Sequence, residues 1–408
     1  MIEKIKESID NKRFGCGIFI DLRKAFDTVN HQILIKKLEH YGVRGVVLEW
    51  FKSYLSNRKQ FVYINGHSSE LLNISCGVPQ GSVLGPLLFL IYINDLPNIS
   101  KLFYFYLFAD DTHIYHEAES LDKLEYEINK GLKSLHSWLI LNRLSLNIKK
   151  TNFVVFHAYN KPLDTKITLK IQRKAISEKD HVKYLGVLVD AGLTWKAHIE
   201  HVSKKVSRAI GILYKIRPYI NTNILKTLYY SLVYSHFNYA VEAWGSADLT
   251  HLNTLHLQQK RIIRLINFSD QRLDDFSFQT VDPLYFRLKF LKIYDIFRLR
   301  LLLFIFKSLS KVTPCNFHDW FLINDTRETR AKFLNLDKKH LEKDIKNKIK
   351  TRTLIIPKSR LVHYGDKLTK VLGANIWNDL PPNMRVEELS FSKFRSMIIE
   401  YLFDQYIH

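Results

Sequence analysis

The stretch Leu107-Phe108-Ala109-Asp110-Asp111-Thr112 sets two adjacent acids between two aromatic runs. The runs 102–106 and 113–116 are rich in bulky β-forming residues, and such runs on either side of a short polar break predict a β-hairpin with both carboxylates at its tip. Adjacent carboxylates repel each other, and burying one without a partner costs several kcal/mol. The hairpin therefore predicts a nearby cation, and a solvent-exposed Asp-Asp turn is the alternative.

A third acid, Asp21, stands in a similar setting far upstream, where it ends the apolar run 17–20. Such a run is typical of a short buried strand. Hard divalent cations such as Mg²⁺ prefer carboxylate oxygens, and two ions roughly 3.5–4 Å apart can activate an attacking oxygen and stabilise a leaving one. Three carboxylates on neighbouring strands are the minimum protein contribution to such a site. We therefore predict phosphoryl transfer, and an Asp21 on a different sheet would exclude it.

The composition is that of a globular and strongly basic protein. The 408 residues are 46% hydrophobic and 13% aromatic, with a formal net charge of +21. This length allows two or three domains, and this charge indicates a polyanionic partner such as nucleic acid, with an anionic membrane surface as the alternative. The three isolated cysteines predict neither a disulfide framework nor a zinc knuckle. Since no signal-peptide pattern or membrane-spanning stretch is found, we expect an intracellular protein of the nucleus or cytoplasm that is not secreted.

Charge is unevenly distributed along the chain. Residues 15–140 contain 12 Lys or Arg and 13 Asp or Glu, whereas residues 141–217 contain 16 and 5. We expect the near-neutral part to hold metal ions and the basic part to hold a phosphate backbone. A solvated basic surface is the alternative for the second part.

Apolar periodicity and turn residues predict the secondary structure. Helices are expected at 30–41, 46–55, 87–95, 121–141, 198–216, 225–234, 252–266, 338–350 and 392–403. Strands are expected at 61–64, 153–156 and 184–189, with a hairpin turn at Asn65-Gly66. The residues expected to face inward are Leu34, Leu38 and Tyr41 in the first helix and Val47, Phe51 and Leu55 in the second.

Three ordered motifs give the chain a resemblance to a known family. The motifs are Phe19-Ile20-Asp21-Leu22-Arg23-Lys24-Ala25-Phe26-Asp27, Gly77-Val78-Pro79-Gln80-Gly81 and Phe108-Ala109-Asp110-Asp111-Thr112. In these residues and their order the chain resembles the reverse transcriptases of non-LTR retrotransposons, in particular the jockey-like and CR1-like branches. Leu144-Ser145-Leu146-Asn147 with Lys150, and Lys183-Tyr184-Leu185-Gly186, are similar to the fourth and fifth motifs of that family.

The resemblance implies an α/β fold with the architecture of a right-hand polymerase. The expected domains are a palm at 1–180 with partial fingers at about 29–75, a primer grip and helical thumb at 181–270, and a basic helical C-terminal region at 271–408. The palm would consist of an antiparallel sheet with packed helices. Only about twenty residues precede Asp21, so we expect this chain to lack the first fingers segment and the N-terminal endonuclease of the family.

The resemblance also implies roles for single residues. Asp21, Asp110 and Asp111 would hold two Mg²⁺ ions that align the primer 3′-oxygen with the α-phosphate of a nucleotide. Around the nucleotide, the carbonyl of Leu22 would contact an ion, Phe26 would act as a steric gate, Gln80 and Gly81 would contact the nucleotide, and Lys150 would protonate pyrophosphate. Tyr184, Leu185 and Gly186 would form the primer grip. The thumb residues implied to contact phosphates are Lys204, Lys205, Arg208, Lys215 and Arg217. The residues alone leave core packing open for Phe26, a structural role for the loop at Pro79, and a solvated surface for Lys150.

The implied function is that of an RNA-directed DNA polymerase that extends a DNA primer or target on an RNA template from dNTPs. One alternative is a catalytically dead remnant that still binds nucleic acid. An RNA-dependent RNA polymerase is a second, which Phe26 disfavours because its ring would collide with a ribose 2′-hydroxyl. An intron maturase is a third, and no maturase-like extension is found in the sequence.

Overall fold

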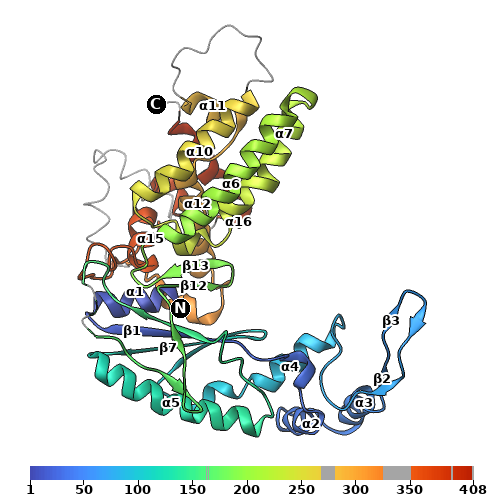
Figure 1. Cartoon of the computed structure of the whole chain (residues 1–408). Coiled ribbons are helices and arrows are strands. Elements are labelled where there is room, and N and C mark those ends of the chain that lie inside the picture. Colours follow the sequence, from blue (N-terminus) through green and yellow to red (C-terminus); the bar gives the residue numbers. More distant parts are fainter. Residues whose placement is uncertain (162, 164, 268–280, 325–350, 387–388, 407–408) are drawn as a thin grey trace. The chain divides into compact units, whose positions relative to one another are not determined.

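The computed structural model describes residues 1–408 except 162, 164, 268–280, 325–350, 387–388 and 407–408, so the helix expected at 338–350 lies outside the described residues. The chain divides into two compact units (Figure 1). Met1 and residues 12–182 form the first unit, and residues 2–11 and 183–408 form the second. Strands and helices both occur in the first unit, which confirms the expected α/β class. Among the described helices, none combines the length and the apolar character needed to cross a membrane.

A mixed five-stranded sheet forms the centre of the first unit. Its strands are β1 (Phe14–Ile20), β6 (Tyr104–Phe108), β7 (Asp111–Ala118), β8 (Asn152–Phe156) and β11 (Ser177–Glu178). They lie in the order β11-β8-β1-β7-β6, in which β11 and β8 are parallel and the other neighbours antiparallel. The first strand of the chain is therefore the central one, and strands from much later in the sequence pair on both sides of it.

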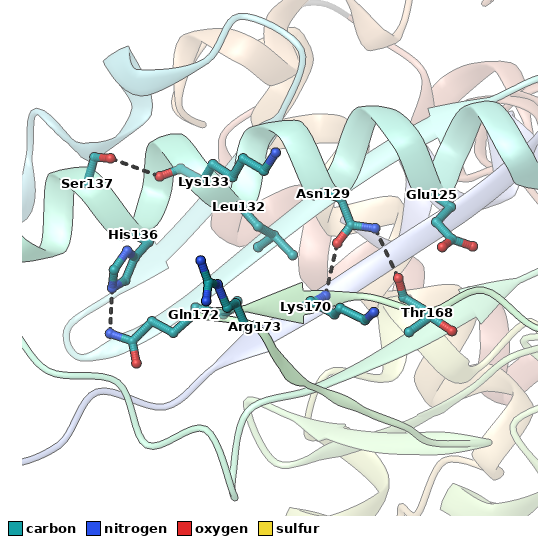
Figure 2. Close-up of a pocket in the computed structure, with 11 residues that line it drawn as sticks. Glu125, Asn129, Leu132, Lys133, His136, Ser137, Thr168, Lys170, Gln172 and Arg173 are labelled. Carbon is teal, nitrogen blue, oxygen red and sulfur yellow. Dashed lines mark hydrogen bonds between the residues drawn. The ribbon is translucent and has the colours of Figure 1, made fainter.

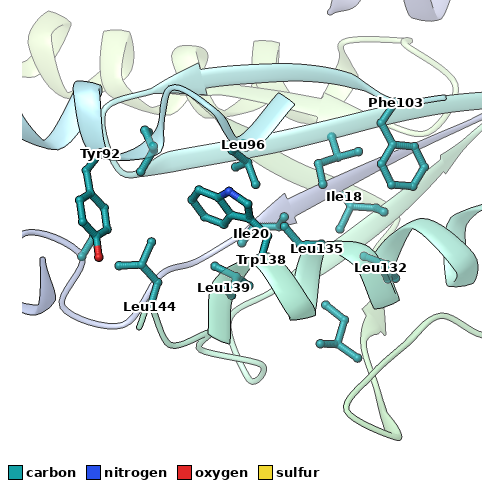
Figure 3. Packing of buried hydrophobic residues seen from close by; sticks show 14 of the residues in the cluster. Ile18, Ile20, Tyr92, Leu96, Phe103, Leu132, Leu135, Trp138, Leu139 and Leu144 are labelled. Carbon is teal, nitrogen blue, oxygen red and sulfur yellow. The ribbon is translucent and has the colours of Figure 1, made fainter. Parts of the chain in front are cut away.

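The long helix α5 (Leu121–Leu141) packs along one face of this sheet (Figures 1 and 3). Its bounds are those predicted. Cys16, Ile18 and Ile20 of β1 are buried in the core that this helix completes. Because successive side chains of a strand point to opposite faces, the odd-numbered residues of β1 face away from α5. The helix residues buried in the same core are Leu124, Ile128, Leu132, Leu135, Trp138 and Leu139, most of them three or four positions apart.

The other helices of the first unit are α2 (His31–His40), α3 (Gly45–Leu55) and α4 (Leu84–Ile93), with 3₁₀ turns η1 (Phe26–Thr28) and η2 (Leu96–Ile99). Its two-residue strands pair as β2 (Lys59–Gln60) with β5 (Leu72–Asn73), β3 (Tyr63–Ile64) with β4 (His67–Ser68), and β9 (Lys170–Ile171) with β10 (Lys174–Ala175). The predicted turn Asn65-Gly66 joins β3 to β4. The N-cap of α2 is Asn30, whose Oδ1 accepts a hydrogen bond from the Ile33 amide at 3.1 Å.

The second unit is mainly helical. Its elements are α1 (Ile2–Asp10), β12 (His181–Tyr184), which begins in the first unit, β13 (Val187–Asp190), α6 (Lys196–Ile216), η3 (Arg217–Tyr219), α7 (Thr222–Tyr229), η4 (Tyr230–Tyr234), α8 (Ser235–Asn238), α9 (Val241–Trp244), α10 (Leu249–Asn267), α11 (Asp282–Leu288), α12 (Ile293–Leu309), η5 (Cys315–Trp320), α15 (Thr369–Asn378), η6 (Pro382–Met384) and α16 (Phe391–Asp404). The helices expected at 198–216, 252–266 and 392–403 correspond to α6, α10 and α16.

The N-terminal helix α1 is bound to residues near the far end of the chain. The Thr369 amide donates to the Glu3 carboxylate at 3.0 Å, and the Leu361 amide donates to Asp10 at 2.7 Å. The Lys6 ammonium, which is nearly fully buried, donates to the carbonyl of Lys367 at 2.8 Å. These contacts place α1 in the second unit, although β1 follows it directly in sequence.

Two residues predicted to face inward are exposed. Tyr41, which directly follows α2, is 44% exposed, and Val47 of α3 is 55% exposed. In α3 it is Leu48, one position later, that is buried. The helix has more apolar residues than its contact with α2 covers, so periodicity alone does not identify the buried ones.

Two predicted elements are interrupted. The expected strand at 184–189 is a hairpin, because Leu185 and Gly186 adopt φ values of +43° and +85° and reverse the chain between β12 and β13. The expected helix at 225–234 is α-helical only to Tyr229 and continues as the π-helical turn η4. Gly186 and Ser231 are single turn-forming residues within otherwise apolar stretches, so the apolar pattern hid both interruptions.

Candidate active site

The predicted hairpin at Asp110 and Asp111 is present. Phe108 of β6 pairs with Asp111 of β7, and Ala109 and Asp110 form the connection between the two strands. Ala109 has a φ of +51°, a left-handed conformation that closes this short turn. Both carboxylates are exposed at the tip.

Asp21 lies at the same end of the same sheet. Ile20 pairs with Thr112 in the antiparallel ladder of β1 and β7, so the residue after Ile20 stands beside the residue before Thr112. Ile20 and Leu22 both pack on the α5 side, which directs Asp21 to the opposite face. The structure thus brings Asp21 and Asp111 together on the sheet face that α5 does not cover.

His113 lies on this same face, one pleat further along β7. Its ring centroid is 5.1 Å from that of Phe19, its partner in the ladder. Burial lowers the pKa of His113 to about 4, so it is a neutral ring beneath the carboxylates at physiological pH. His113 was not among the predicted site residues, because an aromatic β-strand offers no signal that separates a packed histidine from a functional one.

The three carboxylates affect one another electrostatically. Partial burial raises the pKa of Asp111, and the negative charges of Asp110 and Asp21 raise it further. Across the described residues, however, no three His, Cys, Asp or Glu side chains converge closely enough to enclose a metal ion. The arrangement is an open cluster of oxygen ligands at the end of the sheet.

The fourth motif holds the backbone of Asp21. The Asn147 amide donates to the carbonyl of Asp21 at 2.8 Å, and the Asp21 amide donates to Oγ1 of the fully buried Thr151 at 3.3 Å. Lys150 lies in this loop with its side chain exposed, and its amide donates to the carbonyl of Asn147 at 3.0 Å. Leu22 forms a β-bridge with Leu146 beside it. Positioning of Asp21 by this loop was not predicted, since the contact joins residues far apart in sequence.

Phe26 lies in η1, shortly after Asp21. Its ring centroid is 4.6 Å from that of Phe89 on α4, and the side chain packs against the core while staying partly exposed. The Val78 amide donates to the carbonyl of Phe26 at 2.8 Å. The second motif is therefore bound directly to the turn that carries Phe26.

Gln80 and Gly81 lie in the exposed loop that follows. The Gln80 side-chain amide donates to Asp27 Oδ1 at 2.8 Å, so the loop is tied to the first motif a second time. Gly81 has a φ of +79°, a conformation that favours glycine. These contacts give the loop a structural role and leave one side of it open to solvent.

The residues predicted to form the primer grip belong to the second unit. Tyr184 ends β12, and Leu185 and Gly186 form the turn to β13. Tyr239 Oη donates to the carbonyl of Leu185 at 2.6 Å, and its ring lies where a side chain on Gly186 would extend. The turn is thus held from one side by an aromatic residue of its own unit.

Cations gather on α6 in the same unit. Burial lowers the pKa of His201, and the charges of Lys205, Lys183 and Lys204 lower it further. Lys204 and Lys205 are exposed, as are Arg208 and Lys215, while Arg217 lies over the ring of Tyr214 with its guanidinium 4.6 Å from the centroid. This surface suits a polyanion.

Comparison with known proteins agrees with these motifs. Residues 2–189 match the family model described as reverse transcriptase (RNA-dependent DNA polymerase). The chain is 28% identical over 280 residues to a probable RNA-directed DNA polymerase from transposon X-element of Drosophila melanogaster, covering 65% of this chain and 30% of that relative. It is 26% identical over 272 residues to the RNA-directed DNA polymerase from mobile element jockey of the same organism, covering 64% of this chain and 29% of that relative.

The chain thus spans about 30% of the length of the relatives it matches. Among solved structures, a telomerase from Candida albicans in complex with a fragment of telomeric RNA aligns at 14% identity with a TM-score of 0.36, covering 71% of this chain and 52% of the telomerase chain.

Proposed function

We propose that this chain extends a DNA primer on an RNA template. The premise is that residues 2–189 form a reverse transcriptase domain homologous to those of non-LTR retrotransposons. The observation that supports this most directly is the β1–β7 register, which brings Asp21 beside Asp111 at the tip that also carries Asp110. RNA, DNA and dNTPs are the partners that such a polymerase needs. The intracellular location stays a prediction.

Reverse transcriptases depend in general on a divalent metal, and we propose two Mg²⁺ ions at Asp21, Asp110 and Asp111. The donors are carboxylate oxygens, which Mg²⁺ prefers. Burial raises the pKa of Asp111, repulsion by Asp110 and Asp21 raises it further, and a bound cation would relieve that repulsion. Since Mg²⁺ commonly binds through one or two carboxylates together with substrate phosphates, the open cluster fits ions that are completed by the nucleotide. When bound, the ions would supply charge stabilisation for the attacking and leaving oxygens.

The remaining roles are proposals for the residues around this cluster. The Leu22 carbonyl would contact the nucleotide-side ion, Gln80 and Gly81 would lie beside the nucleotide, and Lys150 would protonate pyrophosphate. In the second unit, Tyr184, Leu185 and Gly186 would contact the primer end. The thumb cations on α6 would contact phosphates of the duplex.

Primer extension on an RNA template tests the proposal. We expect Asp110→Ala combined with Asp111→Ala to lower the extension rate by about a thousandfold or more, because the ligands of the transition-state charge are removed. Asp122→Ala is the matched control, since this exposed acid lies in the first turn of α5 and outside the cluster. Extension that persists in the double variant would remove the metal assignment. Binding of RNA without any extension by the native chain would instead support the catalytically dead remnant.

Phe26 allows a separate test of sugar selection. Its partly exposed ring in η1 is proposed to exclude the ribose 2′-hydroxyl, so Phe26→Val should raise incorporation of ribonucleotides relative to deoxynucleotides. A ratio that does not change would mean that Phe26 is only a core residue packed on Phe89. Equal use of both nucleotides by the native chain would favour an RNA polymerase.

A further inference from the structure

A cavity of about 480 Å³ lies between α5 and the β9–β10 hairpin in the first unit (Figure 2). One wall consists of side chains three and four positions apart on the helix, and the other consists of the hairpin. The volume is within the range of ligand-binding sites. The polar side chains most relevant to ligand binding are Glu125, Lys133, His136, Lys170, Gln172 and Arg173.

The hairpin is fixed to the helix by one side-chain amide. Asn129 Nδ2 on α5 donates to the carbonyl of Thr168 at 3.0 Å, and Asn129 Oδ1 accepts from the Lys170 amide at 2.9 Å. A single asparagine thus binds two backbone groups of the segment that enters β9 (Figure 2). The cavity therefore has two walls whose separation is set by hydrogen bonds.

The turn of the hairpin consists of two long polar residues in a strained conformation. Gln172 and Arg173 have φ values of +52° and +64°, which two-residue hairpin turns usually fill with Asn and Gly. Strained residues of this kind cluster at binding sites. Gln172 Nε2 lies 2.5 Å from His136 Nε2, so the turn reaches across to the helix at one end of the cavity.

The cavity is positively charged. Lys133, Lys170 and Arg173 are exposed, and in the described part of the chain none of their side chains forms an ion pair. Glu125 is the acid among the described lining residues, so three permanent cations face one carboxylate. Arginine forks and lysine ammonium groups are the common protein donors to phosphate oxygens.

The cavity and the carboxylate cluster belong to opposite faces of the sheet. Asp21 and Asp111 lie on the face that α5 does not cover, whereas the cavity lies beside α5 on the other face, with the core residues Leu132 and Ile171 in its lining. A ligand in the cavity is therefore separated from the cluster by the sheet. It cannot be the nucleotide at the carboxylates.

We propose that the cavity between α5 and the β9–β10 hairpin binds the phosphodiester backbone of single-stranded RNA outside the polymerase site. The choice of RNA rests on the proposed function, because a template longer than the site leaves a free single-stranded portion. Lys133, Lys170 and Arg173 would contact phosphates. The side-chain amide of Gln172 offers a donor and an acceptor to the 2′-hydroxyl and the base edges of RNA, and DNA lacks the 2′-hydroxyl.

Fluorescence anisotropy of the full chain with a labelled single-stranded RNA over a salt series tests this. We expect Lys133→Glu combined with Arg173→Glu to weaken binding about tenfold or more and to reduce the salt slope by about 0.7 for each phosphate that the variant no longer neutralises. The matched control is Lys123→Glu with Lys130→Glu, two exposed lysines of the same helix outside the cavity. Extension on a short primer–template should be the same in both variants.

Four results would overturn the proposal. The first is RNA binding that is unchanged in the cavity variant, and the second is an equal loss of RNA affinity in the control variant. The third is an equal affinity of the native chain for a single-stranded DNA of the same sequence. The fourth is a cavity variant that loses ATP binding but retains RNA binding, which would make the occupant a free nucleotide. The binding assay does not require extension. Failure of the native chain to extend a primer would therefore leave the cavity test intact, and loss of extension alone would not support it.

Discussion

Ile20 and Thr112 are direct partners in the antiparallel ladder of β1 and β7. This pairing carries Asp21 to the position beside Asp111, although about ninety residues of chain separate the two acids. Leu22 continues the α5-facing side of β1, so both carboxylates point to the other side. The candidate site follows from this one register, because a shift by a single residue would turn Asp21 into the core.

The first prediction concerns the cost of the clustered charges. Because the pKa of Asp111 is raised by burial and by its acidic neighbours, ionised Asp111 destabilises the fold at neutral pH. Asp111→Asn should therefore raise the free energy of unfolding at pH 7, by about 0.2–1 kcal/mol since the group is exposed. The gain should disappear as the pH falls below about 3.9, where the native carboxyl is protonated in both states. Urea unfolding over a pH series measures this, and Asp122→Asn should show no such gain.

The second prediction concerns binding of the metal without catalysis. Mg²⁺ or Mn²⁺ that binds only the folded chain should raise the unfolding temperature in proportion to the logarithm of its concentration above Kd. We expect this rise in the native chain and a smaller one in Asp21→Asn. A rise of equal size in both, measured by differential scanning calorimetry, would show that the stabilising ion binds elsewhere.

The third prediction concerns acid stability. Burial lowers the pKa of His113, His198 and His256 to about 4, with nearby cations contributing at the last two. A folded pKa below the ordinary value of about 6.5 gives stability that is complete above pH 6.5 and is lost as the pH falls toward 4. Each histidine should contribute on the order of 1–3 kcal/mol to this loss.

His256→Phe tests this for one residue, because it keeps an aromatic ring beside Tyr285 and Tyr294 while removing the titration. The free energy of unfolding of this variant should fall less steeply between pH 6.5 and 4. The exposed His67→Gln is the control and should leave the curve unchanged. A His256→Phe curve that runs parallel to that of the native chain would contradict the prediction.

The fourth prediction compares two helical glycines. A Cβ at Gly131 of α5 would overlap the ring of Phe103, whereas a Cβ at Gly211 of α6 would meet no atom within 4 Å. Gly131→Ala should therefore destabilise the chain by about 1–3 kcal/mol through overpacking. Gly211→Ala should stabilise it by about 0.5–1 kcal/mol, since alanine has the higher helix propensity. Chemical denaturation of both variants gives the comparison, and shifts in the same direction would refute it.

The fifth prediction concerns Gln259, a fully buried residue of α10. Its Nε2 donates to Tyr229 Oη and to the carbonyl of Leu291, both at 2.8 Å, and its Oε1 accepts from Tyr285 Oη at 3.2 Å and from the Ile293 amide at 3.1 Å. Gln259→Leu would leave these buried groups without their partner. We expect a loss of about 1–3 kcal/mol in the free energy of unfolding.

Gln258→Leu is the matched neighbour. Gln258 is only partly buried, and its Nε2 donates to Ser203 and Ser207 on α6. Water can replace those bonds, so the loss should be clearly smaller. Equal losses in the two variants would mean that the network around Gln259 contributes nothing beyond an ordinary surface hydrogen bond.

Local signals in the sequence predicted the elements that are formed by residues close together along the chain. The bounds of α5 follow from its apolar spacing, the Asp110–Asp111 hairpin from the aromatic runs around it, and the β3–β4 turn from Asn65-Gly66. The apolar pattern at 184–189 predicted one strand, and only the resemblance to a primer-grip hairpin indicated the turn at Leu185 and Gly186, where the leucine at positive φ is held by its contact with Tyr239. No property of the residue itself indicates that contact.

The sequence by itself determined which acids are present, which hairpin and helix carry them, and which family the motifs resemble. Only the tertiary structure decided that β1 lies between β7 and β8, that Thr151 and Asn147 hold the backbone of Asp21, and that α1 is bound to residues 361–369. The physical reason is the separation along the chain over which each effect acts. Propensity and periodicity act over a few residues, whereas register and long-range hydrogen bonds depend on which surfaces the folded chain buries together.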